Sequence, residues 1–380
     1  MTLIDQLPTP CLIIDQARLE ANLSAMQAGA TGVRLRPHTK THKMIALARR
    51  QEEMGAQGIT VAKASEAAVF VEAGFRDVRI AYTVVGRQKL DQLVQLARQS
   101  RVSFCADTAE GARAASERLA AQGVTLDLLL EIDAGYGRCG IPWDSPDLIG
   151  LAQAIAALPG LNLCGILTHE GNAYTLGLDN IRRVMEETRD RMLTVAHKLH
   201  KAGLCTPDAF EISIGSTPSA HVFENRTAHG FRITEVRPGN YVFHDMTQVA
   251  IGVCGLQQCA LTVLTTVTSK HRTGAGTEKF FLDAGRKVLT GDLAPGRPGY
   301  GCLLYNARAR VGHPHARVTN LSEEHGWGQV RGGTTFAVGD RVQVVPNHAC
   351  VVINTQNEAF VVDNDRIADV WTVDARGRVT

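Results

Sequence analysis

The stretch Arg36-Pro37-His38-Thr39-Lys40-Thr41-His42-Lys43 follows a candidate buried strand at residues 33–36 and precedes an amphipathic helix over about residues 44–53. Placing so many basic side chains at a strand–helix junction is energetically costly, and a purely structural role does not account for that cost. A lysine at the mouth of a protein cavity readily forms a Schiff base, because desolvation lowers its pKa from about 10.4. We therefore predict that Lys40 is a Schiff-base lysine and that its cofactor is pyridoxal phosphate. The alternative is an ordinary solvated loop.

Composition excludes several classes of function. The 380 residues carry 40 Lys and Arg against 38 Asp and Glu, so nothing indicates a nucleic acid or an anionic membrane as partner. No apolar run reaches membrane-spanning length, and the first residues lack the basic and apolar blocks of a signal peptide. Nine scattered cysteines without a CxxC pair favour free thiols over a disulfide framework. We therefore expect a location in the reducing cytoplasm.

Strand-like and helix-like segments alternate over most of the first 240 residues. After a strand at 9–15, the strand-like runs are 33–40, 58–62, 78–82, 102–107, 126–133, 163–169, 210–215 and 233–241, with helical stretches such as 88–98, 109–121, 146–157 and 180–201 between them. Eight strands, nearly all followed by a helix, predict an α/β protein with a (β/α)8 TIM-like barrel. An open doubly wound sheet is the competing architecture, but no Gly-x-Gly-x-x-Gly follows the first strand.

The sequence becomes strand-rich after about residue 250. Residues 253–269 alternate in polarity and are rich in Thr and Val, and convincing helices are absent from the rest. This pattern predicts a second, β-rich domain. We assign residues 10–248 to the barrel, and residues 249–380 together with residues 1–9 to the β-domain.

Unusual polar residues follow several of the predicted barrel strands. Lys40 ends the first strand, and residues 133–140, 169–172, 215–217 and 238–241 lie at the ends of four later ones. In a (β/α)8 barrel the active site is built from the carboxyl ends of the strands. We therefore expect these groups to converge.

Gly215, Ser216 and Thr217 have the features of an anion site. Glycine lets the backbone approach a ligand, the hydroxyls can donate, and the amino end of a short helix near 220–224 favours negative charge. Phosphate sites in this fold commonly use the loops after strands seven and eight. The alternative is a plain turn with a capping hydroxyl.

Arg138 has two interpretations. Its guanidinium can donate to the phenolate oxygen of a bound cofactor, or it can pair with Asp133 on the surface. Glycines on both sides of Arg138 favour the first interpretation.

Pro346-Asn347-His348-Ala349-Cys350 stands out in the second half of the chain. Residues two apart on an extended strand point to the same side, so the His348 imidazole and the Cys350 sulfur can bind one ion. Imidazole combined with thiolate suits zinc, although an isolated His-x-Cys pair more often belongs to packing. Glu323-Glu324-His325-Gly326 is a second polar cluster, which either lines the site or forms a solvated turn.

Together these motifs resemble the D-threonine aldolase and D-serine dehydratase family. The matching segments are R-P-H-T-K-T-H-K, I-D-A-G-Y-G-R-C-G, T-H-x-G, G-S-T-P, E-E-H-G and P-N-H-A-C, and the resemblance runs from about residue 9 to the carboxyl end. Members of that family have the alanine racemase-like fold of type III pyridoxal-phosphate enzymes. By analogy, the resemblance implies a homodimer in which the β-domain of one subunit covers the barrel mouth of the other.

The resemblance also implies roles for individual residues. Lys40, rather than Lys43, becomes the Schiff-base lysine, and Arg138 lies near the ring oxygen of the cofactor. His348 and Cys350 become ligands of a divalent metal, zinc first, with manganese, magnesium or cobalt as further choices. The implied cofactor-binding set also contains His169, Tyr174, Gly215, Ser216, Thr217, Gly239 and Tyr241. The candidates for contacting the substrate carboxylate are His169, Tyr174, Tyr300 and His325.

The metal motif divides the family that the sequence resembles. Aldolases usually read H-x-D-P-T, whereas D-serine and D-3-hydroxyaspartate dehydratases read N-H-x-C. This chain has Cys350 and no following Pro-Thr, and its G-S-T-P also resembles the dehydratase branch. The resemblance therefore implies a lyase acting on a small D-β-hydroxy amino acid, with conversion of D-serine to pyruvate and ammonia as the first choice. D-threonine and 3-hydroxyaspartate stay open as substrates.

The expected mechanism has Lys40 removing the α proton while the metal on His348 and Cys350 assists departure of the β-hydroxyl. One rival is retro-aldol cleavage to glycine and an aldehyde. A second is metal-free racemisation, which requires another base on the opposite face of the cofactor. A non-enzymatic carrier of pyridoxal phosphate is the third, but it has no need of the β-domain.

Overall fold

The computed structural model describes residues 4–273, 276–332 and 336–380. The chain divides into two compact units, which we name the barrel unit and the sheet unit. The barrel unit comprises Gln27–Lys40, Leu47–Gly239 and Gly377–Thr380. The sheet unit comprises Met1–Met26, Thr41–Ala46 and Asn240–Arg376. Among the described residues the nine cysteines form no disulfide, as predicted, and no helix is long and apolar enough to cross a bilayer.

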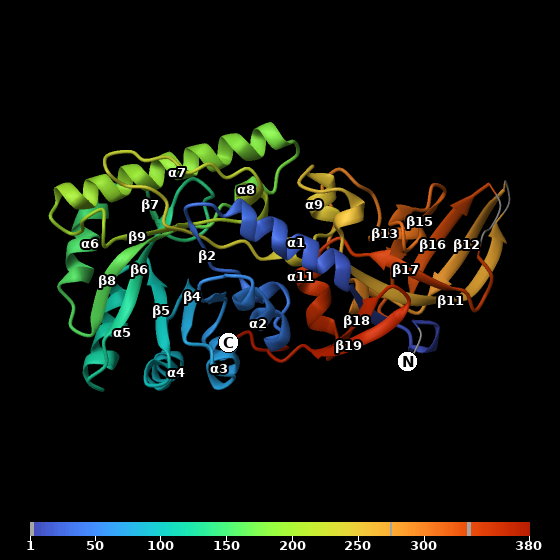
Figure 1. The fold of residues 1–380 in the computed structure, drawn as a ribbon, viewed down its shortest axis with the longest axis horizontal. Helices are drawn as coiled ribbons and strands as arrows, with labels where there is room; N and C mark the ends of the chain where they lie inside the picture. The colour runs from blue at the N-terminus through green and yellow to red at the C-terminus, as the bar shows by residue number, and fades with distance from the viewer. Residues whose placement is uncertain (1–3, 274–275, 333–335) are drawn as a thin grey trace. The chain divides into compact units, whose positions relative to one another are not determined.

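The barrel unit is built on a curled parallel sheet (Figure 1). An isolated parallel bridge between His38 and Thr60 joins the two ends of the strand order. The predicted TIM-like architecture is therefore confirmed. In pairing order the strands are β2 (Arg34–Leu35), β10 (Glu235–Val236), β9 (Glu211–Ile214), β8 (Leu161–Leu167), β6 (Leu126–Asp133), β5 (Arg101–Ala106), β4 (Asp77–Thr83) and β3 (Ile59–Val61), with the short β7 (Ile141–Pro142) beside β6.

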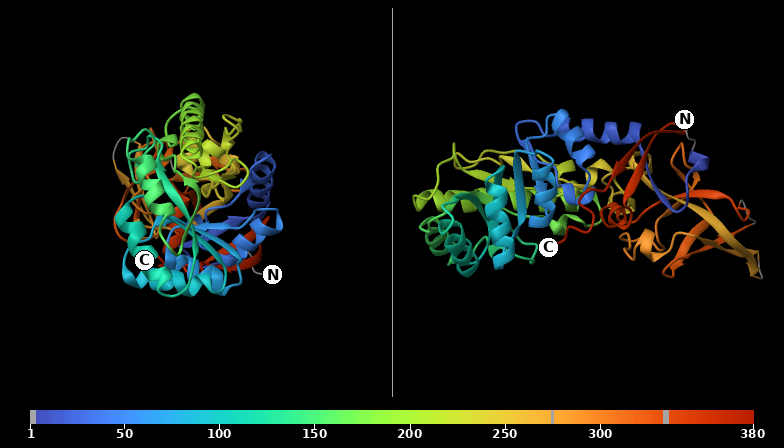
Figure 2. Two further views of the ribbon diagram at one scale, coloured as in Figure 1. Left: turned by 90° about the vertical axis from the view of Figure 1, so that its left-hand side faces the viewer. Right: turned by 90° about the horizontal axis from the view of Figure 1, so that it is seen from below.

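Helices surround the strands of the barrel unit, as the end-on view shows (Figure 2, left). They bury their apolar sides against the sheet; in α7, for example, Ile181, Met185 and Met192 are fully buried. The helices are α2 (Ile45–Glu53), α3 (Ala64–Glu72), α4 (Arg87–Ala97), α5 (Ala109–Ala120), α6 (Leu148–Ala156), α7 (Leu178–Lys201) and α8 (Thr217–His221).

Two barrel strands are much shorter than predicted. The expected strands at 33–40 and 233–241 shrink to β2 and β10 of two residues each. Pro37 and Pro238 follow these strands closely, and proline has no N–H to donate to the ladder. Beyond them the chain forms 3-10 turns at Thr39–Thr41 and Asn240–Val242.

The sheet unit contains a mostly antiparallel sheet, as predicted for the second half of the chain. Its main path is β14 (Val311–Gly312), β13 (Cys302–Asn306), β17 (Arg341–Val345), β11 (Leu261–Thr273), β1 (Cys11–Asp15), β18 (Glu358–Asp363) and β19 (Arg366–Thr372). The strands β12 (Thr277–Leu282), β16 (Gly326–Arg331) and β15 (Ala316–Leu321) extend it from β11.

The first strand of the chain lies in this sheet. β1 pairs antiparallel with β11 and parallel with β18, although the expected boundary counted residues 10–15 with the barrel. All but the last of its residues are buried, and a buried apolar run identifies a strand without identifying its partners. The helix that follows is α1 (Gln16–Gly29), and its amino end is capped by Asp15, whose Oδ1 accepts from the Arg18 amide at 3.0 Å.

Short helices interrupt the sheet unit, and one of them corrects the expected geometry of the His-x-Cys pair. β17 ends at Val345, before Pro346, and His348 is the extended residue that precedes α11 (Ala349–Val352). Cys350 therefore lies in a helical turn rather than on a strand. The backbone N–H of Ala349 donates to Asp245 Oδ2 at 2.9 Å, which stabilises the start of this turn. The others are α9 (Met246–Ala250) and α10 (Arg286–Leu289).

Charged side chains from several strands meet inside the barrel unit. Glu235 is fully buried and accepts from Arg36 Nε at 2.6 Å and from Ser213 Oγ at 2.5 Å. Arg79 Nη1 also donates to Glu235, and its Nη2 reaches Glu211 at 2.6 Å. Burial alone raises the pKa of Glu235, but the surrounding arginines hold it well below its ordinary value of 4.5.

We expect Glu235→Gln to lower the stability of the protein by roughly 3–5 kcal/mol at pH 7, because it leaves buried guanidinium groups without their anion. The folded pKa of Glu235 lies below 4.5, so the ionised carboxylate stabilises the fold above that pH and loses this effect as the pH falls. The difference between variant and wild type should therefore shrink in acid. Urea unfolding midpoints at pH 7 and pH 3 measure this, because the loss develops between 4.5 and the much lower folded pKa. The control is Glu187→Gln, at a partly exposed residue paired with Arg183 and Arg191, for which the expected change is under about 1 kcal/mol.

Candidate active site

A cavity of about 360 Å³ lies at the carboxyl ends of the barrel strands, the position that the fold favours for catalysis. A volume of this size is in the range of small-molecule sites. Four residues predicted from sequence line it, namely Lys40, Arg138, His169 and Gly215. The other lining residues are His38, Ala62, Ala81, Tyr82, Thr83, Glu131, Cys139, Leu167 and Arg237.

Lys40 reaches the cavity from an anchored turn. The neighbouring Thr39 is fully buried, and its Oγ1 shares one proton between two acceptors, Glu66 Oε1 at 2.9 Å and the Thr60 carbonyl at 3.1 Å. Lys43, the other lysine of the motif, belongs to the sheet unit and has a left-handed backbone with φ of 56°. Lys40 is therefore the lysine of this motif that lines the cavity.

Arg138 faces a buried carboxyl rather than the surface partner considered from sequence. Its Nη2 lies 3.8 Å from Glu131 Oε1, which also accepts from Cys139 Sγ at 3.0 Å. Asp133 instead accepts backbone N–H groups of the turn that follows it, such as that of Gly135 at 2.9 Å. Burial raises the pKa of Glu131, and its Oε2 has no hydrogen-bond partner among the described residues. A buried polar atom of this kind is available to a ligand.

His169 lies at the cavity as a neutral imidazole. Burial, followed by the positive charges of Lys40, Arg138 and Arg237, lowers its pKa to about 3. The ring of Tyr136 packs edge-to-face on it at 6.0 Å. At neutral pH His169 is therefore uncharged, and a hydrogen bond with the Gly215 backbone occupies one of its two ring nitrogens.

In the segment predicted to bind phosphate, the Ser216 hydroxyl is hydrogen-bonded within the protein. Ser216 caps α8 and its hydroxyl is paired with that of Ser219, at 2.9 Å. Ser219 Oγ donates to Glu170 at 2.6 Å, and the backbone N–H groups of Gly215 and Ser216 also stabilise this carboxylate. Burial nevertheless raises the pKa of Glu170 to about 7. Ser216 and Thr217 are not among the residues that line the cavity. The helix α8 also begins three residues earlier than the expected 220–224.

Gly215 is the part of this segment that reaches the cavity. Its φ is +124°, which disfavours any side chain, and a Cβ would lie 2.7 Å from the backbone nitrogen of Arg237. We expect Gly215→Ala to cost about 1–3 kcal/mol in stability and to weaken cofactor binding, because the backbone at the cavity wall must shift. Cofactor titration and thermal unfolding measure the two effects. Gly150→Ala in α6, where nothing lies within 4 Å, is the matched control, and we expect it to be neutral or slightly stabilising.

Several predicted residues lie away from this cavity. Tyr174 and Gly239 belong to the barrel unit but are not among its lining residues, and Tyr241 is a buried residue of the sheet unit. Glu323 and Glu324 pair with Lys287 at 3.1 and 2.6 Å in a largely exposed turn. The solvated-turn interpretation of that cluster therefore fits this structure.

Arg237 is a cavity residue that the sequence analysis missed. It is 4% exposed, and it follows Glu235 by two positions at the end of β10. A signal was present, because charged and hydroxyl residues recur at alternate positions of barrel strands, as in Arg34 and Arg36, or Glu211 and Ser213. On a strand this spacing places both side chains on one face, here the interior.

His348 and Cys350 are brought together in the sheet unit. The Cys350 sulfur interacts with the His348 imidazole, and His348 Nδ1 lies 3.3 Å from Asp292 Oδ1. Burial lowers the pKa of His348, but Cys350 and the two carboxylates of Asp245 and Asp292 outweigh it and raise that pKa to about 10. Cys350 Sγ also lies 3.2 Å from the hydroxyl of Thr41, the residue after Lys40.

The His348 and Cys350 side chains supply only part of the ligands that a metal ion needs. A metal-binding histidine typically donates its second ring N–H to a carboxylate, which is the arrangement of His348 and Asp292. No group of three or more His, Cys, Asp or Glu residues suited to a metal occurs in the part of the chain that the structure describes. An ion held by these two residues therefore needs solvent or substrate to complete its coordination.

The barrel cavity fits pyridoxal phosphate by the chemistry of its lining. It offers a primary amine on Lys40, guanidinium donors on Arg138 and Arg237, and the unpartnered oxygen of Glu131. Gly215 forms a backbone wall that a side chain would fill. These are the groups that an aldehyde cofactor with several polar substituents requires.

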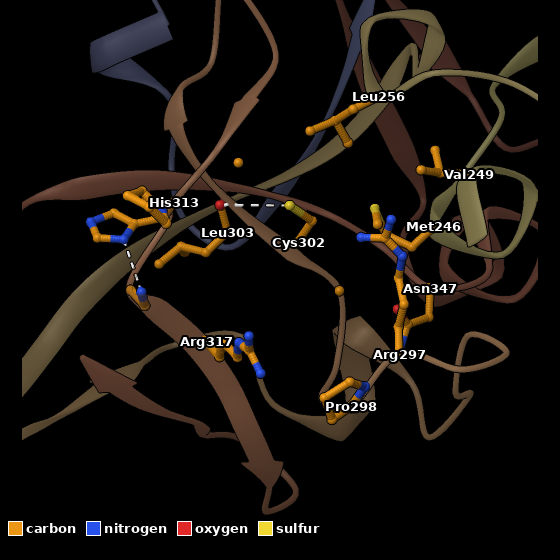
Figure 3. A pocket seen from close by; sticks show the side chains of 14 residues that line it. Met246, Val249, Leu256, Arg297, Pro298, Cys302, Leu303, His313, Arg317 and Asn347 are labelled. Atoms are coloured by element: carbon orange, nitrogen blue, oxygen red, sulfur yellow. Dashed lines mark hydrogen bonds between the residues drawn. The ribbon is translucent and has the colours of Figure 1, made fainter. Parts of the chain in front are cut away.

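A second cavity, of about 450 Å³, lies in the sheet unit (Figure 3). Arg297 and Arg317 line it together with apolar side chains such as Leu303 and Met246. Asn347, the residue before His348, also lines it. Its described lining residues include no lysine and no carboxylate, so it lacks the amine that imine chemistry needs.

Two protein families match the chain. The alanine racemase N-terminal domain family matches residues 14–246, and the putative serine dehydratase domain family matches residues 260–362. The chain belongs to the alanine racemase-like family of fold type III pyridoxal-phosphate enzymes. The resemblance inferred from its motifs is thereby confirmed.

Relatives of this alanine racemase-like enzyme are lyases. It is 35% identical to the D-threonine aldolase of Arthrobacter sp, over 97% of this chain and 93% of that protein. It is 34% identical to the D-threo-3-hydroxyaspartate dehydratase of Delftia sp. (strain HT23), over 90% of this chain and 91% of that protein. The structure of the Delftia enzyme superposes with a TM-score of 0.88, covering 98% of this chain and 99% of that one at 31% identity. The D-serine dehydratase of Dictyostelium discoideum is 25% identical over 95% of both chains.

Proposed function

We propose that this enzyme is a pyridoxal-phosphate- and metal-dependent lyase of small D-β-hydroxy amino acids, and that dehydration of D-serine to pyruvate and ammonia is its reaction. The names of the three relatives support the substrate class, because D-threonine, 3-hydroxyaspartate and D-serine all carry a β-hydroxyl. They leave the choice between aldolase and dehydratase open. The side chains around Cys350 bear on the choice between aldolase and dehydratase.

The observation that carries the proposal is the grouping of Cys350, His348 and Asp292. The Asp292 carboxylate orients the imidazole through Nδ1, which leaves Nε2 for an ion next to the Cys350 sulfur. Both ligands lose a proton on binding. A thiolate combined with an imidazole favours a borderline-soft divalent ion such as zinc. A metal-free form is known for a cysteine-to-alanine variant of the Delftia enzyme, whose structure superposes with a TM-score of 0.88.

Lys40 is the base in this proposal. Its amine lines the cavity, and after exchange for the substrate amine it accepts the α proton at Nζ. The neutral His169 imidazole, which is hydrogen-bonded to the Gly215 backbone through one ring nitrogen, is the first candidate to orient the substrate through the other. Pyridoxal phosphate supplies an electron sink for the α carbon, and a metal on His348 and Cys350 supplies a Lewis acid for the β-hydroxyl.

Cys350 favours dehydration over retro-aldol cleavage. Loss of the β-hydroxyl needs a Lewis acid on that oxygen, whereas aldol cleavage needs removal of its proton, by the metal or by a nearby base, so the preference rests on the motif that contains Cys350. An ion with an imidazole ligand, a thiolate ligand and open positions can hold the hydroxyl as a leaving group. The N-H-x-C motif of the chain agrees with this preference.

A panel of D-amino acids tests the proposal. The purified enzyme is incubated with D-serine, D-threonine or D-threo-3-hydroxyaspartate, with and without a chelator, and the products are analysed. We expect oxo acid and ammonia from D-serine, lost on chelation and recovered with zinc. Glycine plus aldehyde would instead identify an aldolase, and racemisation insensitive to chelator would remove the role of the metal.

A further inference from the structure

The Arg237 guanidinium is fixed by three protein acceptors at the wall of the barrel cavity. Its Nη2 donates to the carbonyl of Thr168 at 2.5 Å. Its Nη1 donates to Ser213 Oγ and, at 3.3 Å, to the carbonyl of Ile214. A guanidinium has five N–H groups, so the remaining two are left for a ligand in the cavity.

Ser213 connects Arg237 to the charged cluster inside the barrel. A serine hydroxyl has one proton, and Ser213 donates it to Glu235 Oε1 at 2.5 Å. Only lone pairs of Ser213 therefore face Arg237 Nη1, which must donate. The Glu235 carboxylate can only accept, so Ser213 donates to Glu235 and Arg237 donates to Ser213.

The ionic cluster is hard to explain by stability alone. Glu235 and Ser213 are fully buried, and Arg36 and Arg79 are 1% exposed. A buried ionic cluster is often no more stable than well-packed apolar side chains of the same volume. Because Ser213 links this cluster to Arg237, we expect the cluster to act on the barrel cavity that Arg237 lines.

We propose that Ser213 and Glu235 are positioning residues that hold the Arg237 guanidinium in one orientation, from which it donates to an acceptor atom of the bound cofactor. The inference rests on the proposed cofactor site of the barrel unit, but not on the identity of the substrate. Arg237 itself only donates, so the cofactor atom that it meets is an acceptor, either on the ring or on the phosphate. Burial lowers the pKa of Arg237 to about 10, which still leaves it cationic at neutral pH.

The test uses the apoenzyme of the full chain titrated with pyridoxal phosphate. We expect Ser213→Ala to raise the dissociation constant roughly tenfold and to change the absorbance maximum of the bound cofactor, because the guanidinium loses its fixed orientation. Ser213→Thr restores the hydroxyl and should recover most of the affinity. A folded Ser213→Ala protein with wild-type affinity and spectrum would overturn the proposal.

The matched control is Ser103→Ala. Ser103 is also buried, at 3% exposed, and accepts from Arg79 Nε at 3.0 Å, but it has no hydrogen bond to Arg237. We expect the Ser103→Ala protein to bind the cofactor with wild-type affinity. If Ser103→Ala lost as much affinity as Ser213→Ala, general destabilisation would explain both losses, which would contradict the proposal. If Ser213→Ala does not fold, Arg237→Lys takes its place, with the same loss of affinity expected and unchanged binding as the contrary result.

Titration with pyridoxal, which lacks the phosphate, locates the acceptor. A loss that persists with pyridoxal assigns Arg237 to the ring, and a loss that disappears assigns it to the phosphate. Either result supports a directed contact. All of these readouts are independent of turnover, so they remain interpretable if the enzyme proves to be an aldolase.

Discussion

Replacement of Lys40 by alanine is expected to abolish turnover and to remove the visible absorbance of the bound cofactor. Lys40 lines the barrel cavity, and in the proposed mechanism it supplies both the amine for the covalent bond and the base for the α proton. Loss of one positioned base alone costs about 10²–10⁴-fold in rate, and loss of the covalent link adds to this. Absorbance spectra and product assays of the purified variant measure the two effects. A yellow, active Lys40→Ala protein would refute the assignment.

A charge-preserving pair of variants separates Lys40 from Lys43. Arginine keeps the positive charge but cannot form the imine. We expect Lys40→Arg to be colourless and inactive, and Lys43→Arg to retain the absorbance, because Lys43 lies in the sheet unit and its carbonyl accepts from the Ala375 amide at 2.9 Å. The opposite pattern would transfer the role to Lys43.

Cys350→Ala is expected to produce the second large loss of activity. In the proposed metal site, removing the thiolate leaves His348 as a single protein ligand, so metal content should fall to background. Lewis-acid assistance is worth several kcal/mol, so we expect turnover of D-serine to fall by roughly 10²-fold or more. Elemental analysis and pyruvate production measure these quantities, and the cofactor absorbance should persist because the barrel cavity does not contain Cys350.

Cys302→Ser is the control for this loss. Cys302 is a partly buried thiol of the same unit, and it lines the second cavity rather than contacting His348. We expect metal content and activity close to those of the wild type. Full activity in a metal-free Cys350→Ala protein would show that the reaction needs no ion on this pair.

Periodicity predicted most of the barrel from sequence. The strand at Leu126–Asp133 has the predicted bounds, because apolar residues fill it between two clear breaks. The predicted strands at 33–40 and 233–241 are too long, because Pro37 and Pro238 cannot donate to the ladder and the chain beyond each proline forms a 3-10 turn. Local sequence also cannot identify the partners of a buried strand, which is why Cys11–Asp15 was counted with the barrel.

The order of the strands predicts that the site residues lie close together, without any knowledge of distances. The carboxyl ends of parallel strands meet at one end of a barrel, so Lys40, His169 and Gly215 line one cavity as expected. Arg237 was missed because a charged residue near Pro238 resembles an exposed loop residue. Its guanidinium donates to Ser213, which lies 24 residues away in sequence and reaches it only through the pairing of β9 with β10.

The His-x-Cys pair shows a different limit. The prediction that His348 and Cys350 act together assumed a strand, whereas the structure brings them together around the start of α11. Asp245 and Asp292, which hold this segment through Ala349 and His348, lie more than fifty residues away in sequence. No local pattern predicts such contacts.

The central claim is that the Lys40 nitrogen binds the aldehyde of pyridoxal phosphate. Borohydride reduction of the holoenzyme, followed by proteolysis and mass spectrometry of the peptides, tests it most directly because the reduced bond survives digestion. The account predicts the phosphopyridoxyl mass on Lys40. The same mass on Lys43, on any other lysine, or on no peptide at all would contradict it.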